Sequence, residues 1–208
     1  MRGLLFAVAV ATVFLPAKMS AQQTPARAAA ALVLAEGTVS IEGKEVEPNA
    51  MPFVLPDVAA VRTAGNRAVI ELKRGGWLFL DKDSSVRVRG NGVYNFNRIE
   101  VVTGTAVVAS ATSTPLVDCE SQIRLSSPGI FRFDAQPADA SGGRTCRFRV
   151  YEGAAAVPLT TVTNALRPGQ SMMCDRRCGD MIPTMEFSTS QLDAFDQWAR
   201  RMLEQIGR

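Results

Sequence analysis

The sequence predicts an all-β protein of short antiparallel strands, arranged as a β-roll, a sandwich or an irregular solenoid, with one C-terminal amphipathic helix. Short segments that alternate apolar and polar residues recur along the chain, and turns rich in glycine and asparagine separate them. A helical period is found only in residues 188–208. The hydrophobic content of 47% and the charged content of 21% are typical of a globular chain with a full core.

The clearest strand pair lies within residues 128–157. Ile130–Phe133 and Cys146–Val150 both alternate apolar and charged residues, and a polar segment with two adjacent glycines connects them. One set of side chains is expected to face the core: Phe131, Phe133, Cys146, Phe148 and Val150. The other set is expected to face solvent: Arg132, Arg147 and Arg149.

The N-terminus has the pattern of a signal peptide. Met1-Arg2 is basic, Gly3–Leu15 is uncharged, and the small residues up to Ala21 suit cleavage. An uncleaved anchor is the alternative, but the apolar run of about 13 residues is shorter than the ~20 that span a bilayer. We therefore expect residues 1–21 to direct export to the periplasm or beyond, and residues 22–35 to form a flexible lead-in. Whether the segment is cleaved or retained stays open.

Four cysteines in an exported chain predict structural disulfides, and four cysteines allow three pairings. We favour Cys119–Cys146 and Cys174–Cys178, although the spacing alone leaves the connectivity open. A zinc site usually has two close cysteine pairs, and a redox site has Cys-x-x-Cys, and neither pattern occurs. The chain contains no histidine. No metal or cofactor is expected.

Residues 36–187 are predicted to form a β domain made of successive short strands. Arg67–Lys73 leads into a two-glycine hairpin turn before Leu78, and Ser85–Arg89 alternates with its arginines outward. A short motif of a glycine before an alternating strand occurs at Gly37, Gly104 and Gly153. The unequal spacing argues against a strict repeat and favours glycines at bends.

Residues 188–208 form the predicted helix. Its apolar positions step by three or four and form one face: Leu192, Phe195, Trp198, Met202 and Ile206. Ser188–Ser190 offers N-cap residues. The face either docks on the protein's own sheet, which we favour, or belongs to a detachable element that binds a partner.

From Glu36 to Met173 the order of these blocks resembles the FecR family, named for the ferric-citrate regulator. The resemblance rests on the glycine-strand blocks Gly37–Gly43, Gly76–Leu80, Ser127–Phe133 and Leu166–Gln170, among others. It implies an all-β periplasmic domain without chemistry of its own. In the family's regulators this domain relays the state of an outer-membrane transducer to a cytoplasmic segment that binds a sigma factor. We expect here a standalone, secreted domain that lacks the sigma-factor-binding region and has no membrane span in the mature chain.

The sequence favours a binding protein over an enzyme. Asp81 and Asp83 are the candidate carboxylates for acid–base catalysis, and we interpret them as part of an ordinary polar turn. Without residues 1–21 the chain carries 21 basic and 20 acidic residues, which gives no reason to expect a nucleic-acid partner. A small-molecule ligand is not expected either.

We therefore expect a protein-interaction, signalling or scaffold module of the cell envelope. An envelope protein would contact Arg132, Arg147 and Arg149 on the sheet, or Phe195 and Trp198 on the helix. The alternative is binding of a glycan or cell-wall polymer through Trp77 and Tyr94. Aromatic residues make up only 7% of the chain, which favours protein binding.

Overall fold

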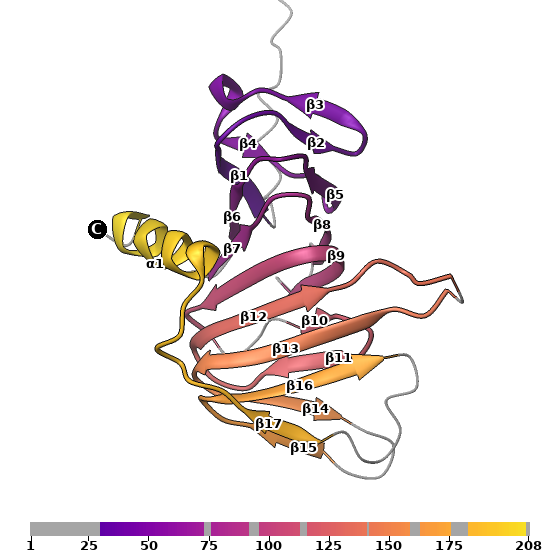
Figure 1. The fold of residues 1–208 in the computed structure, drawn as a ribbon. Helices are drawn as coiled ribbons and strands as arrows, with labels where there is room; N and C mark the ends of the chain where they lie inside the picture. Colours follow the sequence, from indigo (N-terminus) through magenta and orange to yellow (C-terminus); the bar gives the residue numbers. More distant parts are fainter. Residues whose placement is uncertain are drawn as a thin grey trace, which may run out of the picture.

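The computed structural model describes residues 30–72, 76–91, 96–112, 116–140, 142–158, 163–175 and 183–206. Seventeen strands in these ranges form one hydrogen-bonded system, and a single α-helix follows them. The strands lie in two face-to-face layers, with the N-terminal strands at one end of the molecule and the C-terminal strands at the other (Figure 1). The predicted all-β class with a C-terminal helix is confirmed. The predicted signal peptide lies outside the described residues.

The first layer, sheet A, contains nine strands, in this spatial order: β4 (Phe53–Val54), β1 (Ala30–Ala35), β6 (Ala68–Leu72), β7 (Gly76–Leu80), the second half of β9 (Phe96–Ser110), β12 (Gly129–Ala135), β13 (Thr145–Glu152), β16 (Gln170–Asp175) and β17 (Thr184–Glu186). Sheet A is antiparallel throughout. It carries the helix α1 (Ala194–Ile206) on its outer face.

The second layer, sheet B, also contains nine strands, in this order: β3 (Lys44–Val46), β2 (Val39–Ile41), β5 (Val58–Thr63), β8 (Ser85–Asn91), the first half of β9, β10 (Leu116–Asp118), β11 (Gln122–Leu125), β14 (Ala155–Pro158) and β15 (Thr163–Leu166). Only the β9–β10 pair is parallel among the described strands. A one-turn 3₁₀ helix, η1 (Pro48–Ala50), connects β3 to β4.

The chain passes back and forth between the sheets, and the recurring glycine motif marks three of these crossings. Gly37 lies between β1 and β2, and Gly153 lies between β13 and β14. Gly104 lies inside the long β9, where the strand leaves sheet B and joins sheet A. Gly104 has a φ of +83°, and a Cβ there would lie 2.5 Å from the Ser84 hydroxyl oxygen. The bend therefore requires glycine.

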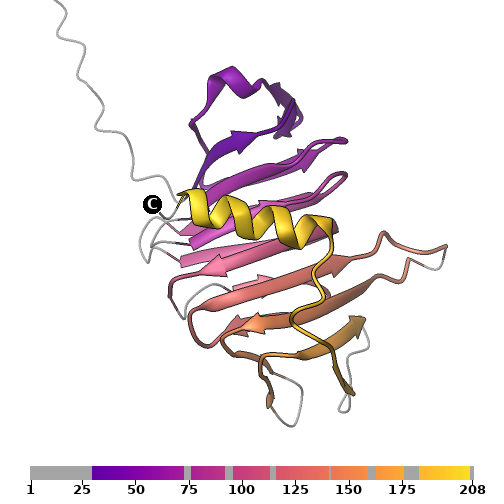
Figure 2. The ribbon, with the colours of Figure 1, turned by 60° about the vertical axis from the view of Figure 1, so that its left-hand side comes forward.

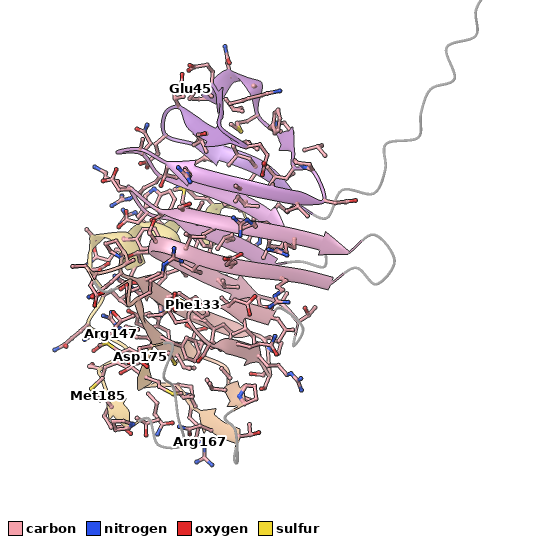
Figure 3. All side chains as sticks on the ribbon, turned by 90° about the vertical axis from the view of Figure 1, so that its right-hand side faces the viewer. Glu45, Phe133, Arg147, Arg167, Asp175 and Met185 are labelled. Carbon is pink, nitrogen blue, oxygen red and sulfur yellow. A yellow bond between two sulfur atoms is a disulfide. The ribbon has the colours of Figure 1, made fainter. Side chains whose placement is uncertain are left out.

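The core lies between the two sheets, and alternate side chains of the strands enter it. In β12 and β13 the five side chains predicted to face the core are fully buried. The Phe148 ring stacks between Phe131 and Phe133, with ring centroids 6.4 and 5.0 Å away. Phe133 lies near the middle of the molecule, whereas Glu45 and Arg167 lie near its two ends (Figure 3). The predicted pairing of these strands is confirmed, with Phe133 opposite Phe148.

Two predicted boundaries are wrong. The segment 22–35, predicted as a flexible lead-in, contains β1, which pairs with β4 and β6 and buries Leu32 completely. The helix begins at Ala194 and not at residue 188. In the first case the alanine-rich composition does not prevent strand pairing, because Ala30 and Leu32 pack into the core. In the second, a residue closer to the helix supplies the cap.

A disulfide joins the layers. Cys119 follows β10 in sheet B, Cys146 lies on β13 in sheet A, and their Cα atoms are 5.6 Å apart. This is the first of the two favoured pairings. Cys174 is buried on β16 opposite Cys146, and Cys178 lies outside the described residues, so the Cys174–Cys178 pairing stays a prediction.

Among the described helices, none is long and apolar enough to span a membrane.

Candidate interaction surface

The outer face of sheet A brings the predicted interaction residues together. One row of direct cross-strand neighbours runs over this face from β6 to β17: Val69, Phe79, Val107, Arg132, Arg149, Ser171 and Met185. The helix α1 lies across this sheet face (Figure 2). It covers the apolar end of the row, where Val69, Phe79 and Val107 are buried against it. Met185, at the far end, is 42% exposed.

Asp193 determines where α1 begins. Its Oδ1 accepts hydrogen bonds from the backbone N–H groups of Phe195 and Asp196, both at 2.9 Å. In the other direction, Oδ2 of Asp196 accepts a hydrogen bond from the backbone N–H of Asp193 at 3.4 Å. This reciprocal arrangement is a capping box, and it satisfies donors that the first helical turn leaves without partners. The serines at 188 and 190, predicted as caps, instead lie 2.8 Å from each other through their hydroxyls.

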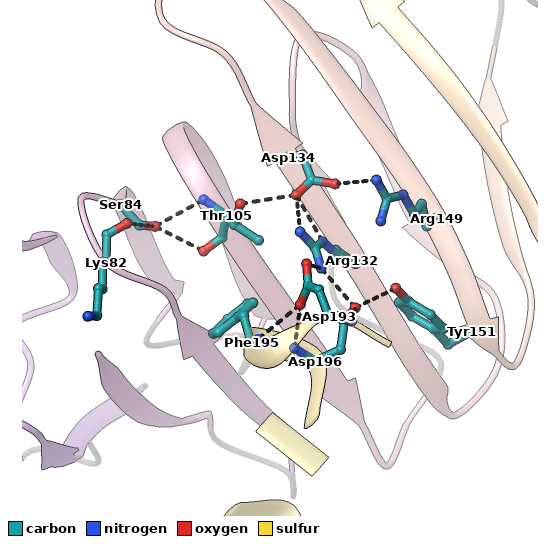
Figure 4. Close-up of polar contacts among 10 residues, drawn as sticks. All are labelled: Lys82, Ser84, Thr105, Arg132, Asp134, Arg149, Tyr151, Asp193, Phe195 and Asp196. Atoms are coloured by element: carbon teal, nitrogen blue, oxygen red, sulfur yellow. Dashed lines mark hydrogen bonds and ion pairs between the residues drawn. The ribbon is translucent and has the colours of Figure 1, made fainter. Parts of the chain in front are cut away.

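The same two aspartates anchor the helix to the sheet through Arg132 (Figure 4). Nη1 of Arg132 lies 2.5 Å from Asp193 Oδ2 and 2.8 Å from Asp196 Oδ2. Its Nε donates to Asp134 Oδ1 at 2.9 Å. The Tyr151 hydroxyl donates to Asp196 Oδ2, also at 2.8 Å. One guanidinium therefore binds one carboxylate from its own strand and two from the start of the helix, the cap residue Asp193 and Asp196 in the first turn.

On the sheet side of this cluster, Asp134 has further polar contacts. Asp134 Oδ1 also accepts from the Thr105 hydroxyl at 3.0 Å, and its Oδ2 lies 3.5 Å from Arg149. The backbone N–H of Thr105 donates to the Ser84 hydroxyl oxygen at 3.0 Å. The cluster thus extends over β9, β12 and β13 and holds Arg132 in one orientation.

Burial and charge act against each other in the cluster. Burial disfavours the charge of Arg132, but Asp134, Asp193 and Asp196 outweigh this effect and raise the pKa of Arg132 above its ordinary value. Burial raises the pKa of Asp196, although Arg132 and Tyr151 oppose the rise. For Asp193, burial is outweighed by the helix N–H groups and Arg132, and its pKa is lowered. Burial and the bond to Asp196 raise the pKa of Tyr151.

The remaining turns of α1 dock through apolar contacts. Phe195 and Trp198 are only 2% and 5% exposed. The Trp198 ring meets Phe79 edge-on at 6.1 Å between centroids and stacks with Phe195 at 5.8 Å. The guanidinium carbon of Arg67 lies 5.3 Å from the Trp198 ring, and its Nε is paired with Asp81 at 2.9 Å. Of the two interpretations of the helix, docking on its own sheet agrees with the structure.

These contacts show which of the predicted interaction residues are exposed and which are buried under α1. The expectation that Arg132 faces solvent is wrong, because it points away from the core but α1 covers it, leaving 7% of the residue exposed. Arg149 is partly buried beside Asp134, and Arg147 is exposed. Phe195 and Trp198 contact the sheet, so they are not presented to a partner in this conformation. Of the predicted arginines, only Arg132 forms an ion pair with residues of the helix end, so it and the helix, predicted as separate candidate contacts, share one internal interface.

The partners of Arg132 were not identified from the sequence. Asp193 and Asp196 lie 61 and 64 residues away in the chain, and no local pattern connects them to Arg132. A usable signal was present, however. β6, β7 and β9 carry apolar residues on both faces, as in Ala68-Val69-Ile70 and Ala106-Val107-Val108. Such segments are typical of strands that are covered on both sides.

The residues weighed for other functions have structural contacts or lie outside the described ranges. Asp81 pairs with Arg67, and Asp83, at a φ of +54°, accepts from the N–H of Gly65 at 3.0 Å. These contacts agree with the interpretation of both aspartates as turn residues. Trp77 lines a groove of about 260 Å³ next to Leu203 of α1. Tyr94 is outside the described residues.

The comparisons with known proteins identify a similar fold among solved structures. No protein-family model and no curated protein matches the sequence. The structure is similar to the crystal structure of a candidate anti-sigma factor from Parabacteroides distasonis, with a TM-score of 0.52 and 14% sequence identity. The match covers 64% of this chain and 62% of that chain. A second crystal structure of a candidate anti-sigma factor from this organism aligns with 13% identity and a TM-score of 0.49, covering 64% and 61%.

The chain therefore spans less than two thirds of the length of these solved structures. At this level of identity the first likeness shows a shared fold. The resemblance to the FecR family stays a prediction.

Proposed function

We propose that this chain is an exported, non-enzymatic protein-interaction module that acts in signalling or as a scaffold in the cell envelope. The observation that carries the proposal is the docking of α1 on the outer face of sheet A. A helix lying on an apolar sheet face is a form of recognition that proteins also use between chains. The fold shared with a candidate anti-sigma factor and the Cys119–Cys146 disulfide support a role in regulation and an oxidising compartment.

The contact surface that we propose is the α1 interface itself. Undocking of α1 would uncover an apolar strip on sheet A, formed by Val69, Phe79, Val107 and Ala109. It would also leave Arg132 without its two helical carboxylates. A partner helix with acidic residues in its first turn and aromatic residues in its second would satisfy both parts of this surface. The proposed partner is an envelope protein, and by family resemblance an outer-membrane transducer is the first candidate.

A crosslinking pull-down from envelope fractions tests the proposal. The wild-type chain is compared with Trp198→Ala, which weakens docking of α1, and with the matched control Arg201→Ala, an exposed position on the same helix. We expect the wild type and the control to recover the same envelope protein in equal amounts. Trp198→Ala should recover more of it, because weaker docking of α1 uncovers the proposed surface on sheet A.

Two outcomes contradict the proposal. Recovery of cell-wall polymer without any protein would contradict a protein-interaction function. Equal or lower recovery by Trp198→Ala, with this variant shown to be folded by circular dichroism, would contradict the proposed surface.

A further inference from the structure

A polar groove of about 440 Å³ lies on the outer face of sheet B, on the side of the molecule opposite to α1. Side chains from β8, β9, β10 and β11 and from the segment before β13 line it. The residues that matter for its chemistry are Arg89, Arg98, Glu100, Asp118, Gln122 and Arg144. Three arginines and, with Glu120, three carboxylates line the groove, so it carries both signs of charge in equal number.

The strand register places two of these arginines directly opposite each other. Arg89 on β8 faces Arg98 on β9. Like charges in direct cross-strand positions destabilise a sheet, so this pair is an unfavourable local choice. Arg98 pairs with Asp118, and Arg89 lies 3.6 Å from Glu100, whose nearer partner is Arg87 at 2.7 Å. About half of each arginine side chain remains exposed, so both can still contact a ligand.

The disulfide holds the walls of the groove together. Cys119 lies in the tight turn that connects Asp118 to Gln122, and Glu120 in this turn has a φ of +59°. On the other side of the disulfide, Arg144 precedes Cys146 by two residues and approaches Glu120 at 4.0 Å. The Cys119–Cys146 bond thus joins the acidic wall and the Arg144 wall, which come from different sheets. The groove is therefore preformed.

We infer that this groove binds an acidic sugar, that is, a polyhydroxylated ligand with a carboxylate. The facing guanidiniums of Arg89 and Arg98 offer the planar N–H pairs that match a carboxylate. Glu100 and Asp118 accept hydrogen bonds from hydroxyl groups, and Gln122 can both donate and accept. The equal numbers of arginines and carboxylates argue against a ligand that is anionic throughout. The volume lies within the roughly 300–1,000 Å³ of small-ligand sites.

This inference is independent of the α1 interface and goes beyond the proposed function. It differs from two expectations of the sequence analysis. There, no small-molecule ligand was expected, and Trp77 and Tyr94 were the candidate residues for glycan binding. The ligand can be a free acidic monosaccharide or a unit of an acidic polysaccharide, because the recognised chemistry is the same.

Isothermal titration calorimetry of the full chain with a matched pair of ligands measures their affinities and tests the inference. Methyl β-D-glucuronide and methyl β-D-glucoside differ only at C6, which is a carboxylate in the first and a hydroxymethyl group in the second. Inorganic phosphate serves as an anion without hydroxylated carbons. We expect saturable binding of the glucuronide and at least tenfold weaker binding of both other probes. A tetrasaccharide in which glucuronate alternates with a neutral sugar should bind more tightly than the methyl glucuronide if a polymer is the natural ligand, and equally if a monosaccharide is.

Variants locate the site. Arg89→Gln removes one guanidinium and should weaken glucuronide binding at least tenfold. Arg62→Gln changes an exposed arginine on β5 of the same sheet, outside the groove, and should leave binding unchanged. Three results would overturn the inference: no saturable binding of the glucuronide, equal binding of phosphate and glucuronide, or equal loss in the two variants. If Arg89→Gln does not fold, Arg98→Lys, which keeps the charge but loses the planar pair of donors, provides the same comparison.

Discussion

Replacing Arg132 with glutamine tests the structural account of the α1 interface most directly. The change leaves three carboxylates, Asp134, Asp193 and Asp196, without their shared cation. Removing one partner of a buried ion pair typically costs about 3–5 kcal/mol, because it leaves charge buried without compensation. Arg132 is 9% exposed at the side chain and Asp196 is 4% exposed, so solvent screens this pair little. We expect a loss of about 3–4 kcal/mol in the free energy of unfolding near pH 7.

The loss should depend on pH with a defined sign. Burial already raises the pKa of Asp196 in the folded protein, and removal of Arg132 must raise it further. An acid whose folded-state pKa lies above its unfolded value stabilises the folded state below the unfolded pKa. That stability is lost as the pH rises through the folded pKa. The free energy of unfolding of Arg132→Gln should therefore come closer to that of the wild type as the pH falls toward about 4.

Urea unfolding followed by tryptophan fluorescence at pH 7 and pH 4.5 measures both quantities. Arg147→Gln is the matched control, since Arg147 is exposed on the same sheet face, and its cost should stay within about 0.5 kcal/mol. A loss below about 1 kcal/mol for Arg132→Gln at pH 7 would refute the buried cluster. A loss of the same size at both pH values would refute the assignment of the cost to unpaired carboxylates.

Three further predictions concern the fold. Trp198→Ala should lower the free energy of unfolding by about 3–5 kcal/mol in urea titrations, because a buried indole is lost from the α1 interface. Replacing Cys119 and Cys146 together with serine opens a 27-residue loop and should cost about 3–4 kcal/mol by the same measurement, whereas a cost near zero would show that the disulfide does not constrain the unfolded chain. Gly104→Ala should lower the melting temperature far more than Gly142→Ala. Both glycines have positive φ, but a Cβ meets nothing within 4 Å at Gly142, so equal shifts would exclude the steric explanation.

The β12–β13 pair shows how much of the fold could be predicted from local pattern. Period-two alternation identified both strands, their pairing and the five side chains that enter the core. These properties depend on residues close in sequence, because in a strand each side chain points opposite to the previous one. The Cys119–Cys146 pairing could also be predicted, since both cysteines lie in or beside recognisable strands.

The environment of Arg132 depended on a different kind of information. Its direction away from the core was correctly predicted, but whether water or protein lies there is determined by a helix more than 60 residues later in the chain. The same holds for the groove on sheet B, where the turn after β10 and the segment before β13 meet through a disulfide between two sheets. Alternation along a strand determines which face a residue occupies. What covers that face depends on packing between distant segments. The apolar face of the helix and the strands that are apolar on both faces indicate that a cover exists, but they do not show which polar side chains it brings together.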